Sequence, residues 1–509
     1  MAQSKIRVRF APSPTGPLHI GGVRTALYNY LFARKHGGDF LLRIEDTDQT
    51  RYVKGAEDYI IESLKWCGII FDEGVTVGGP YAPYRQSERK ELYHQYAEKL
   101  INWGNAYYAF DTPEELEKLR KGSESQGKSF SYNCQIRDSL NNSLRLSKEE
   151  TDKLISSGIH YVVRLKVPMN ELIEMTDLIR GNIKVNSSTI DDKVLFKSDG
   201  MPTYHLANVV DDYLMKITHV IRGEEWLPSL PIHVLLYNFL GWKDVMPEFA
   251  HLPLLLKPDG KGKLSKRDGD KLGFPVFPLE WKDPASGEIS SGYRESGYFP
   301  EAVVNLLAFL GWNPGTEQEI FSMDQLIESF SLEHVHKAGA KFDFEKAKWF
   351  NHQYLVLKSD EELVSLFIPI LKNKDIKVEL DYVTKVCGLV KDRVNFVNDF
   401  WQQSSFFFKA PESYDLEAVK KRWKDNIPQL MEELKTDLGS VDPFSAENIK
   451  NCIHQFVETK QANIGAIMNS IRLVLVGGSF GPDLFLIAEF LGKNEVIIRI
   501  EKAILKIGK

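Results

Sequence analysis

The first fifty residues alternate between strand, turn, helix and strand. Residues 6–10 alternate apolar and charged side chains, and the proline- and glycine-rich run 11–17 ends that strand. Residues 21–34 repeat apolar side chains at helical spacing, and residues 40–44 form a second apolar strand. Because strands and helices alternate, we predict an α/β domain with a parallel sheet. Both strands lead into polar residues, which makes the ends of the strands candidate functional positions.

The chain is longer than one hydrophobic core usually supports, with 509 residues. Short mixed elements interrupt the α/β pattern, which then resumes, and helical periodicity dominates beyond Glu301. We expect a Rossmann-like nucleotide-binding catalytic domain in two halves, an inserted α+β domain and a helical remainder. The predicted boundaries are 1–106 for the first half, 107–200 for the inserted domain, 201–262 for the second half, 263–355 for a lysine-rich loop with a helical connecting domain, and 356–509 for an all-helical region.

Two segments lack periodicity and are rich in small or polar residues, 121–147 and 274–298. Both are expected to be exposed surface insertions. Their composition alone suggests no function.

Composition excludes several classes of protein. A net charge of −6 gives no overall field that would attract nucleic acid, so any such contact must come from local basic patches. No apolar run is long enough to span a bilayer and no apolar signal core opens the chain, so we expect a cytoplasmic protein with no membrane partner. Four scattered cysteines show no zinc-ligand spacing, and we expect buried free thiols and no metal site.

A glycine pair follows a histidine at the start of the first helix, in residues 19–22 (HIGG). Glycines there would let a phosphate approach the backbone, where free N–H groups and the helix dipole favour an anion. His19 would then lie beside that phosphate. A histidine that only caps the turn is the alternative for this motif taken alone.

A second cationic motif, KLSKR, occupies residues 263–267 after the second half of the α/β pattern. Three cations on a loop could close over a triphosphate and neutralise charge that develops during phosphoryl chemistry. Taken alone, a lysine cluster is more often a solvated basic loop.

Together the two motifs resemble the HIGH and KMSKS motifs, the ATP-binding signatures of class I aminoacyl-tRNA synthetases. Further segments are similar to the bacterial-type glutamyl-tRNA synthetases: 9–16 (RFAPSPTG), 43–48 (RIEDTD), 84–87 (YRQS), 204–212 (YHLANVVDD) and 221–226 (IRGEEW). The resemblance extends over nearly the whole chain. It implies a ligase that activates glutamate with ATP and transfers it to the 3′-terminal adenosine of tRNA.

The same resemblance implies roles for individual residues. The implied catalytic residues are His19, Lys263 and Lys266. The implied glutamate pocket consists of Arg9, Ser13, Glu45, Tyr204, Asn208 and Arg222, and the implied ATP site of Gly21, Gly22, Glu225, Leu255, Lys263, Ser265, Lys266 and Arg267. Chemistry agrees, because a carboxylate at a strand end can bind the substrate ammonium and an arginine fork can bind the γ-carboxylate. Tyr204 and Asn208 would share one face of a helix.

The resemblance also implies the partners: ATP with Mg²⁺, L-glutamate and tRNA-Glu. The inserted domain would bind the acceptor stem, and the helical C-terminal region would bind the anticodon, with Lys391 and Arg393 among its contacts. We expect a monomer, and we expect glutamate activation to require tRNA. Some members of the family carry a cysteine cluster near residue 107; this chain has none there, so we expect no zinc.

Two alternatives remain open from the sequence. A glutaminyl-tRNA synthetase shares the early motifs, but its anticodon part is built from β-barrels, whereas this C-terminal half is predicted to be helical. A non-catalytic tRNA-binding protein would be expected to have lost His19 or Lys266, and both are present. Whether tRNA-Gln is also a substrate cannot be predicted from these motifs.

Overall fold

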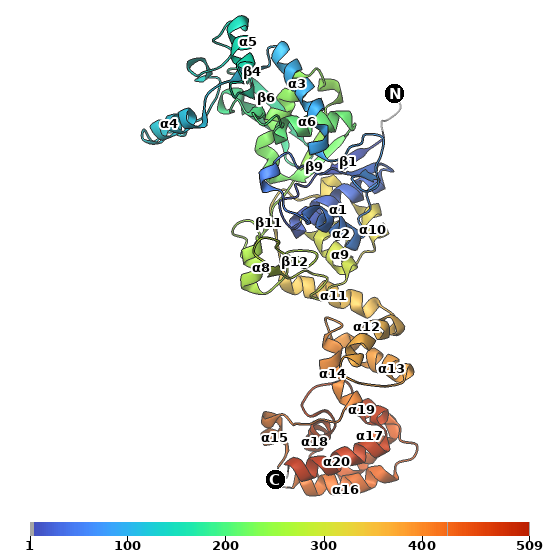
Figure 1. The fold of residues 1–509 in the computed structure, drawn as a ribbon. Helices are drawn as coiled ribbons and strands as arrows, with labels where there is room; N and C mark the ends of the chain where they lie inside the picture. The colour runs from blue at the N-terminus through green and yellow to red at the C-terminus, as the bar shows by residue number, and fades with distance from the viewer. Residues whose placement is uncertain (1–4, 425, 508–509) are drawn as a thin grey trace. The chain divides into compact units, whose positions relative to one another are not determined.

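The computed structural model describes residues 5–424 and 426–507, with the backbone alone at residue 270. The chain divides into two compact units, Met1–Ala347 and Lys348–Lys509, which Figure 1 draws in one ribbon. The candidate catalytic residues all belong to the first unit.

A three-stranded parallel sheet opens the first unit. Its order is β1 (Arg7–Phe10), β2 (Asp39–Leu42) and β3 (Glu73–Gly74), covered by α1 (Ile20–Lys35) and α2 (Ala56–Trp66). The helix expected at 21–34 is confirmed to within one residue at each end. The second strand ends two residues earlier than expected, so Glu45 follows it in a short extended segment. Buried apolar residues of α1 such as Val23 and Leu27 pack against this sheet.

A second sheet continues the first through a backbone hydrogen bond from Thr218 N to the Arg7 carbonyl, 2.9 Å long. Its order is β7 (Gly181–Asn186), β6 (Leu172–Asp177), β10 (Glu248–Leu252) and β9 (His219–Gly223), with α6 (Tyr204–Leu214) and α7 (Leu230–Phe239) nearby. β10 is parallel to both of its neighbours. Strands β6 and β7 come from the span 107–200, yet β6 is hydrogen-bonded into this sheet.

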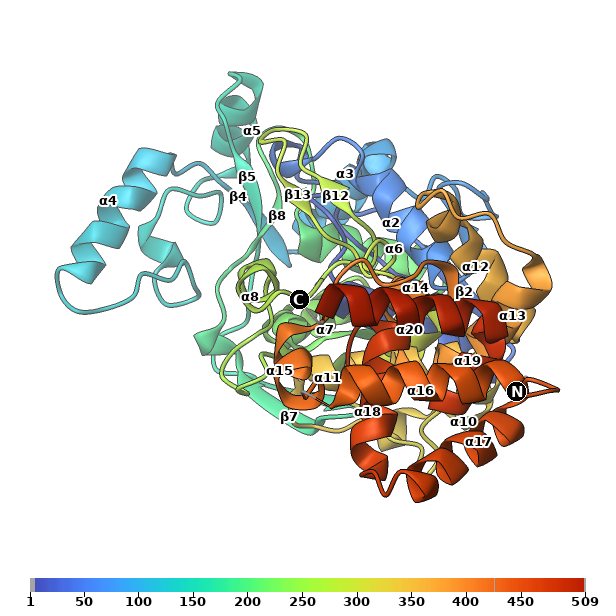
Figure 2. The ribbon, with the colours of Figure 1, turned by 90° about the horizontal axis from the view of Figure 1, so that it is seen from below.

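The rest of the span 107–200 forms a smaller antiparallel sheet with its own helices. Its strands are β4 (Ala106–Ala109), β5 (Val162–Leu165) and β8 (Val194–Phe196), and its helices are α4 (Pro113–Glu124) and α5 (Lys148–Ser156), after α3 (Lys90–Asn102). Helix α4 buries no residue, and in both views it projects away from its neighbours (Figure 1, Figure 2). The segment 121–147, expected to be an exposed insertion, is largely exposed, but Tyr132 and Leu140 join Tyr107 in a small buried cluster, so the expectation is wrong for these residues.

The expectation that 274–298 is a surface insertion is wrong for residues 274–279 and for several later side chains, which are buried. Phe277 and Trp281 are buried, and Trp281 packs edge-on against Tyr59 of α2 with ring centroids 5.2 Å apart. The tip between β12 (Trp281–Lys282) and β13 (Ile289–Ser290) is largely exposed. The segment follows the core surface without being a regular element, so its buried residues show no period.

The remainder of the first unit and the second unit are mainly helical. The elements after β10 are β11 (Leu255–Leu256), α8 (Lys266–Leu272), α9 (Pro300–Phe309), α10 (Met323–Ser329), β14 (Ala340–Lys341) and α11 (Phe344–Leu357). The second unit continues with α12 (Asp360–Lys372), α13 (Leu380–Val390), α14 (Asp399–Phe408), α15 (Leu416–Arg422), α16 (Ile427–Ser440), α17 (Ala446–Thr459), α18 (Ile464–Val476), α19 (Leu484–Leu491) and α20 (Lys493–Ile507). Helices α16 and α20 run side by side (Figure 2). The described part of this unit contains no strand, as the helical periodicity predicts.

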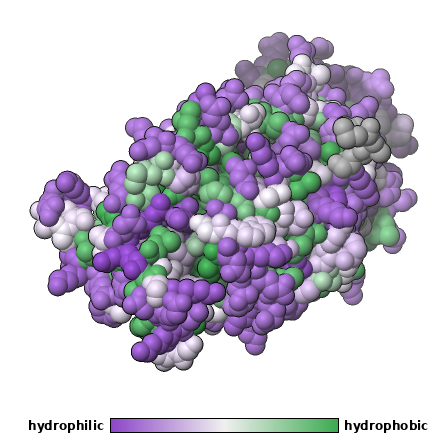
Figure 3. All heavy atoms as spheres, turned by 90° about the horizontal axis from the view of Figure 1, so that it is seen from above, coloured by the Kyte–Doolittle hydropathy of each residue, from purple (hydrophilic) through white to green (hydrophobic). Residues whose placement is uncertain are grey.

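Hydrophilic residues dominate the face drawn in Figure 3, with hydrophobic side chains interspersed among them. None of the helices in the described ranges has the length and apolarity needed to cross a membrane.

Candidate active site

A pocket of about 530 Å³ opens at the carboxyl ends of β1 and β9, beside the start of α1. Parallel sheets place ligand sites at this edge, because the loops that follow the strands converge there. Twelve of the predicted site residues line it: Arg9, Ser13, His19, Gly21, Gly22, Glu45, Tyr204, Asn208, Arg222, Glu225, Leu255 and Lys263. Lys266 lines a smaller adjoining pocket that also contains His19 and Gly22, whereas Ser265 and Arg267 line neither.

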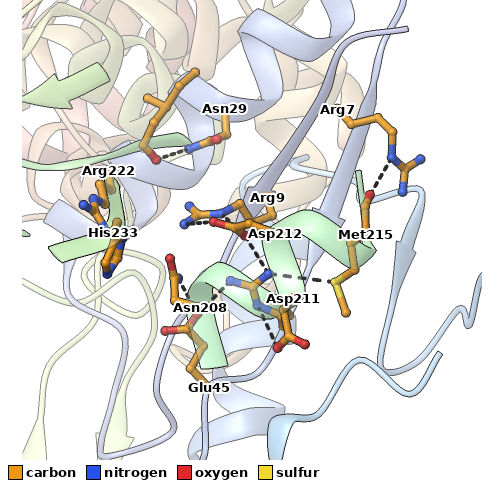
Figure 4. Close-up of polar contacts among 12 residues, drawn as sticks. Arg7, Arg9, Asn29, Glu45, Asn208, Asp211, Asp212, Met215, Arg222 and His233 are labelled. Atoms are coloured by element: carbon orange, nitrogen blue, oxygen red, sulfur yellow. Dashed lines mark hydrogen bonds and ion pairs between the residues drawn. The ribbon is translucent and has the colours of Figure 1, made fainter. Parts of the chain in front are cut away.

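One wall of the pocket is a buried network of paired charges. Arg9 donates from Nε and Nη2 to both oxygens of Asp212, at 3.0 and 3.2 Å. The fully buried Arg43 bridges Asp212 and Glu45, at 2.7 and 2.8 Å. Asn208 donates to the same Glu45 oxygen at 2.9 Å, as Figure 4 shows. The charge of Arg9 is therefore compensated, and Oε2 of Glu45 is the oxygen left for a ligand.

The opposite wall contains an arginine of a different kind. Arg222 is 5% exposed, and its hydrogen-bond partners are all neutral: the Tyr204 hydroxyl at 2.6 Å, His251 Nε2 at 3.0 Å, and His233 Nδ1 and the Trp226 carbonyl at 3.5 Å. Figure 4 shows Arg222 beside His233, apart from the carboxylates of the first wall. None of the ion pairs among the described residues includes Arg222. A buried, unpaired guanidinium is unfavourable until an anion binds it.

His19 caps α1 and also points into the pocket. Its Nδ1 accepts from Gly21 N at 3.1 Å. His19 therefore both caps the turn and lines the pocket, the two roles that the sequence left as alternatives. Since Nδ1 accepts, the proton is on Nε2, and that buried atom has no protein partner. Burial, with the nearby charge of Lys263, lowers the pKa of His19 to about 4. Neutral His19 therefore offers one N–H to an anion in the pocket.

Close packing at the start of α1 favours glycine at position 22. A Cβ on Gly22 would lie 2.5 Å from Leu18 Cδ1 and would force Leu18 to shift, whereas a Cβ on Gly21 would meet only ordinary contacts, the nearest at 3.4 Å. The first free N–H of the helix, at Ile20, donates to the Val276 carbonyl at 3.0 Å. The segment 274–298 therefore anchors the helix that carries the histidine and glycine motif.

Both lysines of the KLSKR loop are paired with carboxylates. Lys263 Nζ lies 2.7 Å from Glu225, and Lys266 Nζ lies 3.0 Å from Glu288 at the hairpin tip. Burial raises the pKa of Glu225, but its interactions, first among them the hydrogen bond from Lys263, outweigh that and leave the pKa below its usual value. Exposed pairs of this kind contribute about 0–1 kcal/mol, so either lysine can change partners at little cost.

Sequence patterns do not predict the roles of several residues of this site. Arg43 and Asp212 lie inside recognised segments, but only the fold pairs them with Glu45 and Arg9. Trp226 covers the Tyr204 ring with centroids 4.4 Å apart. Arg24, one turn after the glycines, reads as an ordinary helix charge but is buried in the pocket wall.

The two expected tRNA contacts lie in the second unit. Lys391 donates to Asp360 at 2.8 Å, and Lys391 and Arg393 share a short 3-10 turn after α13. All four cysteines are free thiols. Cys67, Cys134 and Cys387 are buried as expected, whereas Cys452 is only partly buried, so the expectation is wrong for that residue. The described residues contain no group of three or more His, Cys, Asp or Glu placed to hold a metal.

Buried histidines should make stability depend on pH. The pKa of His19 and that of His205 are both about 4, chiefly because of burial, whereas an unfolded chain has histidine pKa values near 6.5. The unfolded state therefore binds more protons as pH falls from about 6.5 to about 4, and the free energy of unfolding decreases in that window. Urea-unfolding midpoints at several pH values should fall less steeply in His205→Gln than in the wild type, while the exposed-site control His160→Gln should follow the wild type. Equal slopes for His205→Gln and wild type would contradict this account.

Comparison with known proteins identifies close relatives over the whole chain. The family model described as "tRNA synthetases class I (E and Q), catalytic domain" matches residues 5–349, and an anticodon binding domain model matches 362–504. Glutamate–tRNA ligases of Phocaeicola vulgatus and Christiangramia forsetii are each 60% identical, covering 99% and 98% of this chain and 99% of their own. The crystal structure of a glutamate tRNA ligase from Elizabethkingia meningosepticum, in complex with its amino acid, is 55% identical with a TM-score of 0.95, over 99% of this chain and 100% of that one.

Proposed function

The chain belongs to the glutamate–tRNA ligases, class I synthetases with a helical anticodon-binding domain, and from that membership we propose roles for the residues of its pocket. Glutamate occupies the space between the charge-paired wall and Arg222. ATP lies beside the start of α1, under the KLSKR loop. Magnesium arrives with ATP as part of the substrate complex and shares the neutralisation of its phosphates.

The observation that carries the glutamate assignment is the unpaired charge of Arg222. The Arg222 guanidinium lines the pocket and its hydrogen-bond partners are neutral. A γ-carboxylate would therefore supply the anion that Arg222 lacks. At the other end of the substrate, Glu45 accepts from the α-ammonium, supported by Asn208. A cation and a carboxylate that line one pocket suit an amino acid with charges at both ends.

ATP is assigned to the other part of the pocket by its donors. The Nε2–H of His19 is the donor without a protein partner in the space where phosphates would lie. Gly21 and Gly22 line the same space, but their N–H groups already donate to His19, contrary to the free donors expected from the sequence. Glu225 and Leu255 line the adjoining part, which suits ribose and adenine. Lys266 lines the neighbouring pocket together with the same histidine.

The reaction then proceeds in two steps without a covalent enzyme intermediate. An oxygen of the glutamate α-carboxylate attacks the α-phosphorus of ATP, the bond to the bridging oxygen breaks, and pyrophosphate leaves. A hydroxyl of the terminal adenosine of tRNA attacks the carbonyl of the adenylate, loses its proton, and AMP leaves. The chain contributes positioning and charge stabilisation of the phosphate that carries developing negative charge.

We further propose how the rest of the chain serves tRNA. The small antiparallel sheet and its helices bind the acceptor end, and the helical second unit binds the anticodon, with Lys391 and Arg393 as contacts. We also propose that the protein is a cytoplasmic monomer and binds no zinc. tRNA-Glu is its substrate.

Aminoacylation with purified tRNA tests this function directly. We expect glutamate to be charged onto tRNA-Glu, and glutamate-dependent exchange of pyrophosphate into ATP to require that tRNA, because the tRNA end completes the glutamate site. Glutamine should give no product with either tRNA-Glu or tRNA-Gln. Exchange at full rate without tRNA would overturn the tRNA requirement, and charging by glutamine in preference to glutamate would overturn the pocket assignment.

A further inference from the structure

A chain of three buried side chains crosses neighbouring strands behind the pocket. Asp177 ends β6, His251 lies in β10 and Arg222 lies in β9. The carboxylate Oδ2 of Asp177 is 2.6 Å from His251 Nδ1, and Arg222 Nε is 3.0 Å from His251 Nε2. Asp177 and His251 are 1% and 0% exposed, so no solvent substitutes for these contacts.

The hydrogen bonds that link Arg222, His251 and Asp177 run in one direction only. Arg222 Nε can only donate, so His251 Nε2 must accept, and the histidine proton is on Nδ1. That proton points at Asp177, which therefore selects the tautomer. Burial is the main cause that lowers the pKa of His251, and with the charge of Arg222 it outweighs the opposite effect of the Asp177 hydrogen bond, so the imidazole stays neutral.

Backbone groups hold the first member of the chain. Oδ1 of Asp177 accepts from the N–H groups of Ile179 and Arg180, at 2.9 and 2.8 Å. Oδ2 is thus the atom left for His251. The carboxylate is fixed by the turn that joins β6 to β7, and its direction does not depend on any ligand.

We propose that Asp177 and His251 are positioning residues for Arg222, and that through it they set the enzyme's affinity for the substrate γ-carboxylate and its rejection of glutamine. The inference rests on the proposed role of Arg222 in binding that carboxylate. Bonding at Nε fixes the plane of the guanidinium. Nη1 and Nη2 contact only neutral partners, so the substrate carboxylate supplies the anion that these nitrogens lack. A site held in one geometry by buried partners binds its ligand with less loss of freedom.

A histidine suits this position better than a carboxylate would. A carboxylate in contact with Arg222 would hold it as firmly but would cancel its charge, as Asp212 does for Arg9. Neutral His251 is oriented by Asp177 and in turn orients Arg222. The imidazole ring also separates the negative charge of Asp177 from the guanidinium. Arg222 thus stays both fixed and in need of an anion.

Asp177→Asn tests whether Asp177 sets the direction of the hydrogen bonds between His251 and Arg222. Oδ1 of the asparagine keeps the two backbone donors, so its NH₂ faces His251 Nδ1 and forces the proton onto Nε2. Two donors, His251 Nε2–H and Arg222 Nε–H, then face each other. We expect the glutamate KM to rise about 10- to 100-fold and the glutamate-to-glutamine ratio of kcat/KM to fall, with the KM for ATP unchanged. Glu174→Gln, an exposed change on the same strand, should have no effect.

Two variants at His251 separate positioning from plain support of the fold. His251→Gln keeps an acceptor near the Nε2 position for Arg222, and His251→Asn keeps a donor near the Nδ1 position for Asp177. We expect the asparagine variant to lose glutamate affinity and discrimination, and the glutamine variant to keep most of both. We expect His251→Gln to be the less stable of the two variants, because it leaves the Asp177 carboxylate buried without its donor.

The outcomes distinguish this inference from the proposed function. If Arg222→Gln abolishes discrimination but His251→Asn retains it, the positioning role is wrong and the pocket assignment stands. If both His251 variants lose activity in step with their unfolding midpoints, the role is structural only. If Arg222→Gln itself leaves discrimination unchanged, the proposed glutamate pocket fails first.

Discussion

Replacing Arg222 with glutamine should remove most of the activity with glutamate and most of the discrimination against glutamine. In the wild type the unpaired guanidinium gains its anion from the γ-carboxylate, whereas the amide of glutamine brings no charge and an NH₂ that cannot accept. A site built around such a partner rejects the analogue that lacks it by about 10⁴-fold. The measurement is kcat/KM for both amino acids with saturating tRNA, in wild type and in Arg222→Gln.

Arg9 should not compensate for that loss. Arg9 lines the same pocket, but both oxygens of Asp212 already accept from it and compensate its charge. Arg222→Lys is the matched control, since it keeps the charge but loses the planar fork and should preserve part of the discrimination. If the ratio of the two kcat/KM values is the same in wild type and Arg222→Gln, the assignment must be redrawn around Arg9.

Replacing Lys266 with alanine should slow glutamyl-adenylate formation on the order of 100-fold or more while changing ATP affinity far less. The reason is that negative charge grows on the phosphates during the step, and Lys266 lies beside the pocket that also contains His19. Its contact with Glu288 is exposed and cheap to break, so the side chain is available for ATP. Single-turnover adenylation with tRNA bound, measured across ATP concentrations, separates the chemical rate from binding.

Lys271→Ala is the control for that experiment. Lys271 is an exposed lysine of the same helix, α8, and lines neither pocket. It should leave the single-turnover rate unchanged. An unchanged rate in Lys266→Ala as well would return Lys266 to the role of a solvated loop residue.

The sequence predicted the parts of this site that motifs and strand ends mark. Arg9, Glu45 and Arg222 were expected at strand ends, and the fold brings all three to one pocket. Tyr204 and Asn208 were expected to share a helix face, and both lie on α6 and line that pocket. Local patterns sufficed here because each prediction needed only one element and the rule that strand ends converge.

Contacts between distant segments could not be predicted in this way. Asp177 lies in a span that reads as an inserted domain, and nothing local indicates that its strand joins β10 beside His251. The buried side chains of 274–298 have no period because the segment is irregular and is shaped by α1 and α2. A hydrophobic pattern reveals which face of a regular element is buried, but an irregular segment has no such face.

The carboxylate partners of the KLSKR loop have a consequence for how ATP reaches the enzyme. Lys263 with Glu225 and Lys266 with Glu288 each sum to zero charge, so these four groups exert little long-range pull on an approaching polyanion. Capture of the nucleotide is then an exchange of ion pairs: each lysine trades a carboxylate for a phosphate, and two acidic side chains return to solvent. The attraction between these lysines and ATP is gained only at contact, so the two pairs themselves add little salt dependence to the rate of encounter.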